Sequence, residues 1–281
     1  MADVQINASD VMKLRDRTGM QMMKCKAALI QAGGDMEKAL EIIRLENKNA
    51  QIKTADRETT EGRIGVYIEG NKGAILELRC ESAPVAKNEL FGNLVHDVAK
   101  HICHKEPKTP EELLAQPFVD APSKTVNDRI GEVVGLMREN IKPQRMAVLT
   151  GTLASYIHHD GTVGVLLAVE GTPSDAQILR DVCMHIAAKS PPFALREHIP
   201  AERLAKEKEL AKAAAEEQGK NKPANIIEKI AEGKVNTWLS DNVLNDQPFV
   251  KDESKTVGAL LAANGCKLIN FVRYRVGEVA Y

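Results

Sequence analysis

Over residues 1–50 the apolar positions follow a helical period, and two breaks divide this segment into three short predicted helices. Thr18-Gly19 ends the first helix, Gly33-Gly34 ends the second, and Asp35 provides an N-cap for the third. A segment of about 45 residues buries little core, which is typical of an adaptor module. Residues 51–63 are polar without a sustained apolar period, and we predict a linker there.

Beyond the linker the pattern becomes that of strands. Two strand-like runs surround a turn at Gly70-Asn71-Lys72-Gly73, and a second pair surrounds Asp160-Gly161. Each predicted hairpin leads into an amphipathic helix, and a closing strand is predicted over residues 267–276. Strands and helices mixed in this way predict an α+β fold.

The two hairpins belong to an internal duplication. Residues 116–126, which begin Gln-Pro-Phe-Val, recur as residues 247–257. An Asp-Val and His-Ile pattern at residues 97–102 recurs at residues 181–186. The first echo is offset by 131 residues and the second by 84, so the second copy holds 47 additional residues between its echoes.

The additional residues predict a helical insertion. Residues 201–218 are rich in Ala, Glu, Lys and Leu, and a break at residues 219–223 separates them from a second helical pattern. We predict an antiparallel helical hairpin over residues 195–240 whose first arm reaches about 25 Å. Such an arm serves as a partner or dimer contact or as a solvated spacer, with equal support for each. The predicted core subdomains are residues 64–146 and, for the second copy, residues 147–194 with 241–281.

Bulk composition narrows the function classes. The 38 basic and 39 acidic residues give a net charge of −1, so no global positive field draws the chain to nucleic acid. No run approaches the roughly 18 consecutive apolar residues of a membrane span, and no secretory signal is readable. Five scattered cysteines favour reduced thiols. We predict a soluble cytoplasmic protein without direct nucleic-acid or membrane contact.

Motifs of covalent catalysis are absent from the sequence: there is no P-loop, nucleophile elbow, HExxH or CxxC. His96, His101, Cys103 and His104 have the atom types of a zinc site, but only His101 and His104 share a helical face. The duplication places His185 where His101 stands, so a buried imidazole bonded to backbone is predicted in preference to a metal site.

A group of methionines, Met20, Met22 and Met23, has two interpretations. Methionines at the start of a small module's helix more often fill the core than contact a partner. Their flexible, polarisable side chains also suit an adaptable binding face.

Several segments resemble the elongation factor Ts family. Leu14 to Gly19 and Met22 to Leu29 resemble its N-terminal module, which has a ubiquitin-associated-like three-helix fold. Met184 to Ala188 and Gln247 to Asp252 resemble its core signatures. The matching motifs occur in family order from about residue 8 to residue 279.

The resemblance implies a guanine-nucleotide exchange factor for elongation factor Tu, the GTPase that delivers aminoacyl-tRNA to the ribosome. Such a factor has no catalytic residues, metal or cofactor and is not an enzyme of covalent chemistry. It acts by differential binding, holding the nucleotide-free GTPase more tightly than the GDP-bound form. The predicted helical hairpin matches the family's coiled coil, which is associated with dimerisation in some members.

The resemblance also implies partner-binding residues. Arg15, Met22 and Met23 match positions that contact the nucleotide domain of elongation factor Tu. Ile130 and His158 match positions of the core subdomains that touch the partner. For each of the five, the alternative is internal packing or ordinary surface.

One loop departs from the family pattern. The family usually has Thr-Asp-Phe-Val in a loop that approaches the partner's magnesium site and helps to dislodge the ion, whereas this chain has Ser82-Ala83-Pro84-Val85. Burying a Phe is worth about 1.5 to 3 kcal/mol, so its loss weakens the intrusion. Pro84 stiffens the loop and predicts an extended backbone at Ala83. Our hypothesis is that the loop docks at the same place and pushes less hard.

Two alternatives therefore stay open beside an active exchange factor. One is a non-catalytic elongation factor Tu-binding protein whose exchange is impaired by the altered loop. The other is a metal-dependent enzyme that uses the cluster from His96 to His104.

Overall fold

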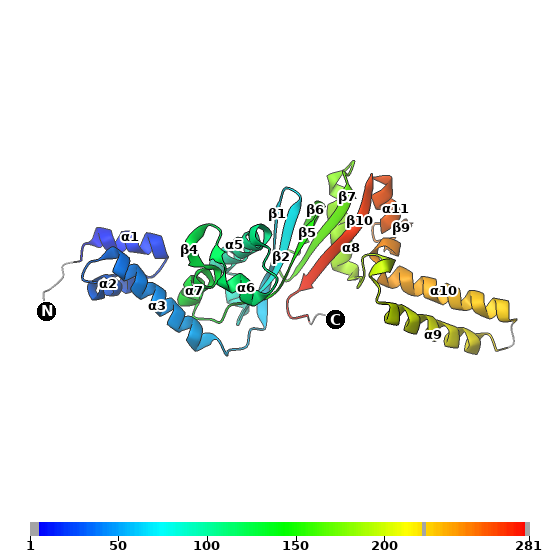
Figure 1. The fold of residues 1–281 in the computed structure, drawn as a ribbon, viewed down its shortest axis with the longest axis horizontal. Helices are drawn as coiled ribbons and strands as arrows, with labels where there is room; N and C mark the ends of the chain where they lie inside the picture. The colour runs from blue at the N-terminus through cyan, green and yellow to red at the C-terminus, as the bar shows by residue number, and fades with distance from the viewer. Residues whose placement is uncertain (1–5, 221–222, 279–281) are drawn as a thin grey trace. The chain divides into compact units, whose positions relative to one another are not determined.

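The computed structural model describes residues 6–220 and 223–278 and confirms the α+β prediction (Figure 1). The chain forms two compact units. Among the described residues, the first unit holds residues 6–67, Leu76–Met146 and residues 275–278. The second holds Ile68–Ile75 and Ala147–Tyr274.

The three predicted N-terminal helices are present as α1 (Ala8–Thr18), α2 (Met22–Gln31) and α3 (Met36–Thr54). Gly19 ends α1 in the left-handed conformation at φ 68°, which glycine adopts without strain. The Asp35 side chain caps α3 by accepting from the backbone N–H groups of Glu37 and Lys38. Val11, Leu14, Met20, Cys25, Leu29 and Ile43 belong to the buried core of this module.

The predicted linker is wrong at its start, because α3 continues to Thr54. The buried residues in this part of the helix are Asn47, Ala50 and Thr54, which have helical spacing but are mostly polar. A pattern of hydrophobic residues therefore does not reveal the helical spacing of these positions. This part of α3 packs against α7 (Val126–Met137), where Gly131 and Gly135 leave room for the approaching side chains.

The first unit also contains most of a three-stranded sheet in the order β1-β2-β5. Strands β1 (Glu61–Glu69) and β2 (Lys72–Cys80) flank the predicted turn, where Gly70 has φ 59°. Strand β5 (Lys142–Thr150) was not predicted, since most of its residues are half-buried and show no alternation. The helices that follow β2 are α4 (Ala83–Ala86), α5 (Glu89–Lys105) and α6 (Pro110–Ala115).

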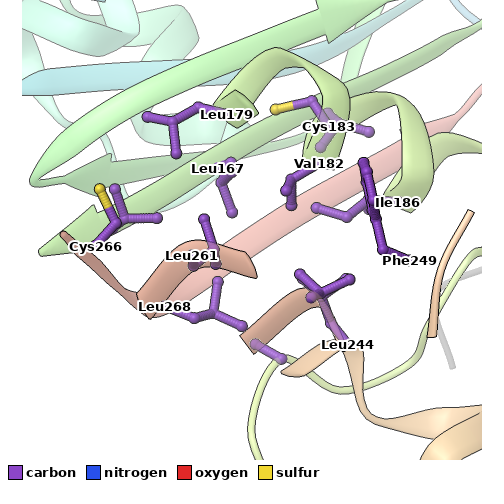
Figure 2. Packing of buried hydrophobic residues seen from close by; sticks show 14 residues of the cluster. Leu167, Leu179, Val182, Cys183, Ile186, Leu244, Phe249, Leu261, Cys266 and Leu268 are labelled. Carbon is purple, nitrogen blue, oxygen red and sulfur yellow. The ribbon is translucent and has the colours of Figure 1, made fainter. Parts of the chain in front are cut away.

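In the second unit a sheet in the order β10-β7-β6 is covered by helix α8 (Ala176–Lys189). Strands β6 (Thr152–Ile157) and β7 (Val163–Gly171) pair antiparallel, and β10 (Cys266–Arg275) is the predicted closing strand. Figure 2 shows the core between these layers and helix α11 (Val257–Ala263). Its labelled side chains include Leu167 of β7, Val182 and Ile186 of α8, Leu261 of α11 and Leu268 of β10.

The repeated Gln-Pro-Phe-Val segments form small hairpins, and a buried histidine packs against each of them. In the first copy β3 (Pro117–Phe118) pairs with β4 (Ala121–Thr125). His101 Nε2 lies 2.9 Å from Gln116 Oε1, and the Val119 N–H donates to His101 Nδ1 at 3.2 Å. The ring centroids of His101 and Phe118 are 6.0 Å apart.

The second copy repeats this arrangement with β8 (Pro248–Phe249) and β9 (Asp252–Thr256). His185 Nε2 lies 2.8 Å from Gln247 Oε1, and the Val250 N–H donates to His185 Nδ1 at 3.2 Å. Both histidines are completely buried. The predicted structural imidazole bonded to backbone is confirmed in both copies.

The additional residues of the second copy form the predicted pair of helices, α9 (Ala201–Gln218) and α10 (Ala224–Asn242), which lie side by side (Figure 1). Short 3-10 helices, η1 (Arg196–His198) and η2 (Leu244–Asp246), precede α9 and follow α10. At the base of the pair, Ile199, Leu239 and Val243 form a small core against Phe193 and Trp238. Within the described segments, each helix is too short or too polar to traverse a bilayer.

Candidate partner-binding site

The N-terminal module presents exposed side chains at the predicted contact positions. Arg15 lies exposed on α1, and on α2 the exposed fractions of Met22 and Met23 are 47% and 75%. Met20, by contrast, is buried in the module's core. The two interpretations of the methionines therefore divide: Met20 fills the core, while Met22 and Met23 supply adaptable apolar surface.

The turn between α1 and α2 fixes where these side chains lie. The Thr18 hydroxyl donates to the Leu14 carbonyl at 2.7 Å, and the Met20 N–H donates to the Thr18 hydroxyl at 3.3 Å. The buried face of α2 is formed by Cys25, Ala28 and Leu29, and Met23 lies off that face.

On α1 and α2, sequence reasoning missed two further exposed apolar residues, Met12 and Ile30, with exposed fractions of 53% and 51%. Their position in the helical period could have indicated this exposure. Met12 directly follows the buried Val11, Ile30 directly follows the buried Leu29, and consecutive helical residues point in different directions.

The loop from Ser82 to Val85 contains a correction. Ala83 was predicted to be extended, but it begins helix α4, and the Lys87 N–H donates to its carbonyl at 3.0 Å. The extended residue is Ser82, with φ −129° and ψ 151°. Pro84 is tolerated at the second helical position because the first turn of a helix does not use its N–H group. Pro84 is exposed and Val85 is buried, so the loop presents a rigid proline to solvent.

Residues of the same unit fix the start of this loop. The Ser82 backbone N–H and hydroxyl both donate to the Glu139 carboxylate, at 3.0 and 2.5 Å. The neighbouring Cys80 thiol donates to the Ser82 carbonyl at 3.4 Å, and burial raises the pKa of Cys80 to about 12. A thiol with so high a pKa stays protonated and unreactive at neutral pH.

His158 lies in the second unit, in the turn that joins β6 to β7. Its Nδ1 is 3.0 Å from the Tyr156 hydroxyl, and its ring contacts that of His159 edge to face at 4.3 Å between centroids. The adjacent Ile157 has an exposed fraction of 41%. This strand end therefore combines imidazole groups with an apolar side chain at the surface.

Ile130 differs from the other predicted contacts. Its side chain is only 1% exposed, on the inner face of α7 beside Val126 and Val134. A buried side chain offers a partner no surface in this conformation. The packing alternative is thus favoured for Ile130.

The histidines and the cysteine that have the atom types of a zinc site each make other contacts in the structure. His101 is engaged by Gln116 and Val119, Cys103 is buried, and the rings of His96 and His104 lie near that of Tyr67. Across residues 6–220 and 223–278, no group of three or more His, Cys, Asp or Glu side chains has the geometry to hold a metal ion. All five cysteines lie in these ranges, buried and outside any disulfide.

A family model described as Elongation factor TS matches residues 81–278, more than half of the chain. The chain belongs to the elongation factor Ts family. Elongation factor Ts of Lactiplantibacillus plantarum is 38% identical over 278 residues, covering 98% of this chain and 93% of the relative. Elongation factor Ts of Trichlorobacter lovleyi is 39% identical over 291 residues, covering 97% and 93%. This elongation factor Ts family member is a factor of translation elongation.

Proposed function

We propose that this elongation factor Ts family member is a cytoplasmic guanine-nucleotide exchange factor for elongation factor Tu. It binds the GDP form of the GTPase, promotes release of magnesium and GDP, and so regenerates the GTP form. The observation that carries the proposal is the exposure of Met22 and Met23 at positions matching the family's partner contacts. When a partner covers exposed apolar surface, the complex is stabilised by about 25 cal/mol for each Å² removed from water.

The proposed mechanism involves no covalent step. The factor binds the nucleotide-free GTPase more tightly than the GDP-bound GTPase, and by linkage its binding lowers the affinity of the GTPase for GDP by the same factor. Arg15, Met22 and Met23 hold the partner, and His158 with the exposed Ile157 provides a second contact. The rigid Pro84 on α4 approaches the partner's magnesium site.

A second candidate function is a non-catalytic elongation factor Tu-binding protein. It is favoured by the sequence at Ser82-Ala83-Pro84-Val85, which lacks the acidic and aromatic side chains that the family usually has in this loop. The two candidates differ in whether binding accelerates nucleotide release. A homodimer through α9 and α10, and the absence of direct nucleic-acid or membrane contact, stay predictions.

Stopped-flow release of fluorescent GDP from elongation factor Tu, with and without this protein at matched magnesium, tests the proposal. We expect strong acceleration that saturates with concentration. Binding without acceleration would favour the second candidate, and the absence of binding would contradict both.

A double variant tests the contact face. Met22→Ala with Met23→Ala is expected to raise the half-saturating concentration about tenfold, which corresponds to about 1.4 kcal/mol of binding free energy. Leu45→Ala is the matched control, since Leu45 is a comparably exposed apolar residue on α3, at 60%. An unchanged half-saturating concentration in the double variant would remove Met22 and Met23 from the interface.

A further inference from the structure

Two carboxylates fasten the start of the α4 loop to the chain segment that follows α7. The Glu139 carboxylate accepts from the backbone N–H of Glu81 at 3.2 Å and from both donors of Ser82. In return, the Glu81 carboxylate accepts from the backbone N–H of Asn140 at 2.6 Å. Each acidic side chain thus binds the backbone of the other segment, in a reciprocal arrangement that we call the carboxylate clamp (Glu81, Ser82, Glu139 and Asn140).

The clamp extends to the end of α3. The buried Asn140 side chain donates to the carbonyls of Ala55 at 3.0 Å and Arg57 at 2.8 Å. The Arg57 guanidinium donates to the Arg138 carbonyl at 3.2 Å and lies 3.4 Å from the Glu81 carboxylate. The connection after α3, the start of α4 and the end of α7 are therefore joined by one hydrogen-bond network.

The orientation of α4 depends on this network. An isolated helix of four residues is unstable, because nucleation fixes several backbone angles for one hydrogen bond. The Ser82 side chain makes no capping bond to α4 and instead donates to Glu139. Hydrogen bonds to an ionised carboxylate are roughly twice as strong as neutral ones, so Glu139 contributes most to holding Ser82 in place.

We infer that Glu139 is a positioning residue for nucleotide exchange: it holds the loop from Ser82 to Val85 at the orientation in which Pro84 meets the GTPase. The inference rests on the proposed function. The loop has no acidic or aromatic side chain to extend its reach, so its effect on the partner depends on where its backbone is placed. Misplacement of a functional group by about 1 Å can reduce a rate a hundredfold.

Glu139→Gln tests the inference with little change of shape. The amide keeps one acceptor oxygen but places an N–H group where Ser82 presents its donors. In a titration of GDP release against factor concentration, we expect the maximal rate to fall about tenfold and the half-saturating concentration to change less than about twofold. Glu58→Gln is the matched control, because Glu58 is an exposed acid in the connection between α3 and β1, and its rate is expected to equal that of the wild type.

Removal of magnesium separates positioning from general damage. Without the ion there is none for the loop to dislodge, so wild type and Glu139→Gln are expected to release GDP at similar rates in excess chelator. Ser82→Ala, which removes only the hydroxyl donor, is expected to lower the maximal rate in the same direction by about twofold to threefold. This variant provides the test if Glu139→Gln does not fold, and an unchanged rate for Ser82→Ala would then overturn the inference.

The outcomes distinguish the inference from the function on which it rests. A wild type that accelerates release, together with Glu139→Gln at the same maximal rate, overturns the inference alone. A defect that persists in chelator also overturns it. A wild type that fails to accelerate release overturns the proposed function and the inference with it.

Discussion

The two copies of the duplicated unit share an interior and differ at the surface. Both enclose a histidine between a glutamine side chain and a backbone N–H, with a phenylalanine ring beside it. In the first copy the helix that follows is α7, of 12 residues, and α3 docks on it. In the second copy the corresponding helix α11 has only 7 residues, and the α9–α10 pair is inserted instead. The repeated residues therefore maintain the same internal packing in both copies. The copies differ in the helices that surround this shared interior.

The largest expected effect comes from removing the shared histidine. His101→Ala or His185→Ala removes the partner of a glutamine side-chain oxygen and of a backbone N–H, and each variant is expected to lose about 3 kcal/mol of unfolding free energy. His159→Ala, at an exposed position, is the control and is expected to cost less than about 0.5 kcal/mol.

Chemical denaturation followed by two probes measures this loss. The single tryptophan, Trp238, lies at the base of α10 and reports on the second unit, while far-ultraviolet circular dichroism reports on all helices. His185→Ala should shift the tryptophan transition more than His101→Ala does. Unequal losses in circular dichroism would show that the two copies do not use the histidine alike.

A smaller effect is expected at the contact that only the first copy has. A Cβ atom on Gly135 would overlap the Asn47 side chain, so Gly135→Ala is expected to cost about 2 kcal/mol. Asn47→Ala in the same chain removes the overlap together with a buried Oδ1 that has no hydrogen-bond partner in the part of the chain that the structure describes, and should restore most of the loss.

The control for Gly135 is another helical glycine with open surroundings. Among the described residues, a Cβ on Gly233 of α10 would meet nothing within 4 Å, so Gly233→Ala is expected to stabilise by about 0.5 to 1 kcal/mol. Urea unfolding of the wild type and of the three variants completes the comparison. If Gly135→Ala were neutral, close packing of α3 on α7 would not be a source of stability.

The sequence predicted those parts of the fold that local patterns determine. The three N-terminal helices follow from their period and breaks, and the buried histidines follow from the internal echo. Strand β5 and the last turns of α3 were not predicted, because the residues of β5 are mostly half-buried and the buried residues at the end of α3 are mostly polar. The extended backbone expected at Ala83 was overridden by the turn of helix that α4 forms.

The candidate site was less predictable than the fold. Family resemblance indicated Met22 and Met23, but a hydrophobic pattern alone could not say that they lie outside while Met20 lies inside. The carboxylate clamp joins Ser82 to Glu139 across 57 residues of sequence, and no local pattern links a serine to a glutamate at that distance. Long-range polar contacts of this kind require the structure.

A pH dependence of stability is expected from both copies. In each copy the backbone N–H of a valine donates to Nδ1, so the neutral imidazole carries its proton on Nε2 and donates it to glutamine. Burial lowers the pKa of His101 and of His185, since the charged form loses its hydration. A second proton on Nδ1 would also face an N–H donor.

Because each folded-state pKa lies below the unfolded value of about 6.5, the unfolded chain binds more protons between the two values. The stability that each neutral histidine contributes is therefore complete above about pH 6.5 and is lost as the pH falls toward the lowered pKa. The free energy of unfolding falls by no more than about 1.4 kcal/mol per pH unit for each histidine. Urea unfolding from about pH 7.5 to about pH 5 should show this loss in the wild type. The doubly substituted His101→Asn, His185→Asn chain, although less stable, should lack this slope, and an identical slope in both proteins would assign the pH dependence to other groups.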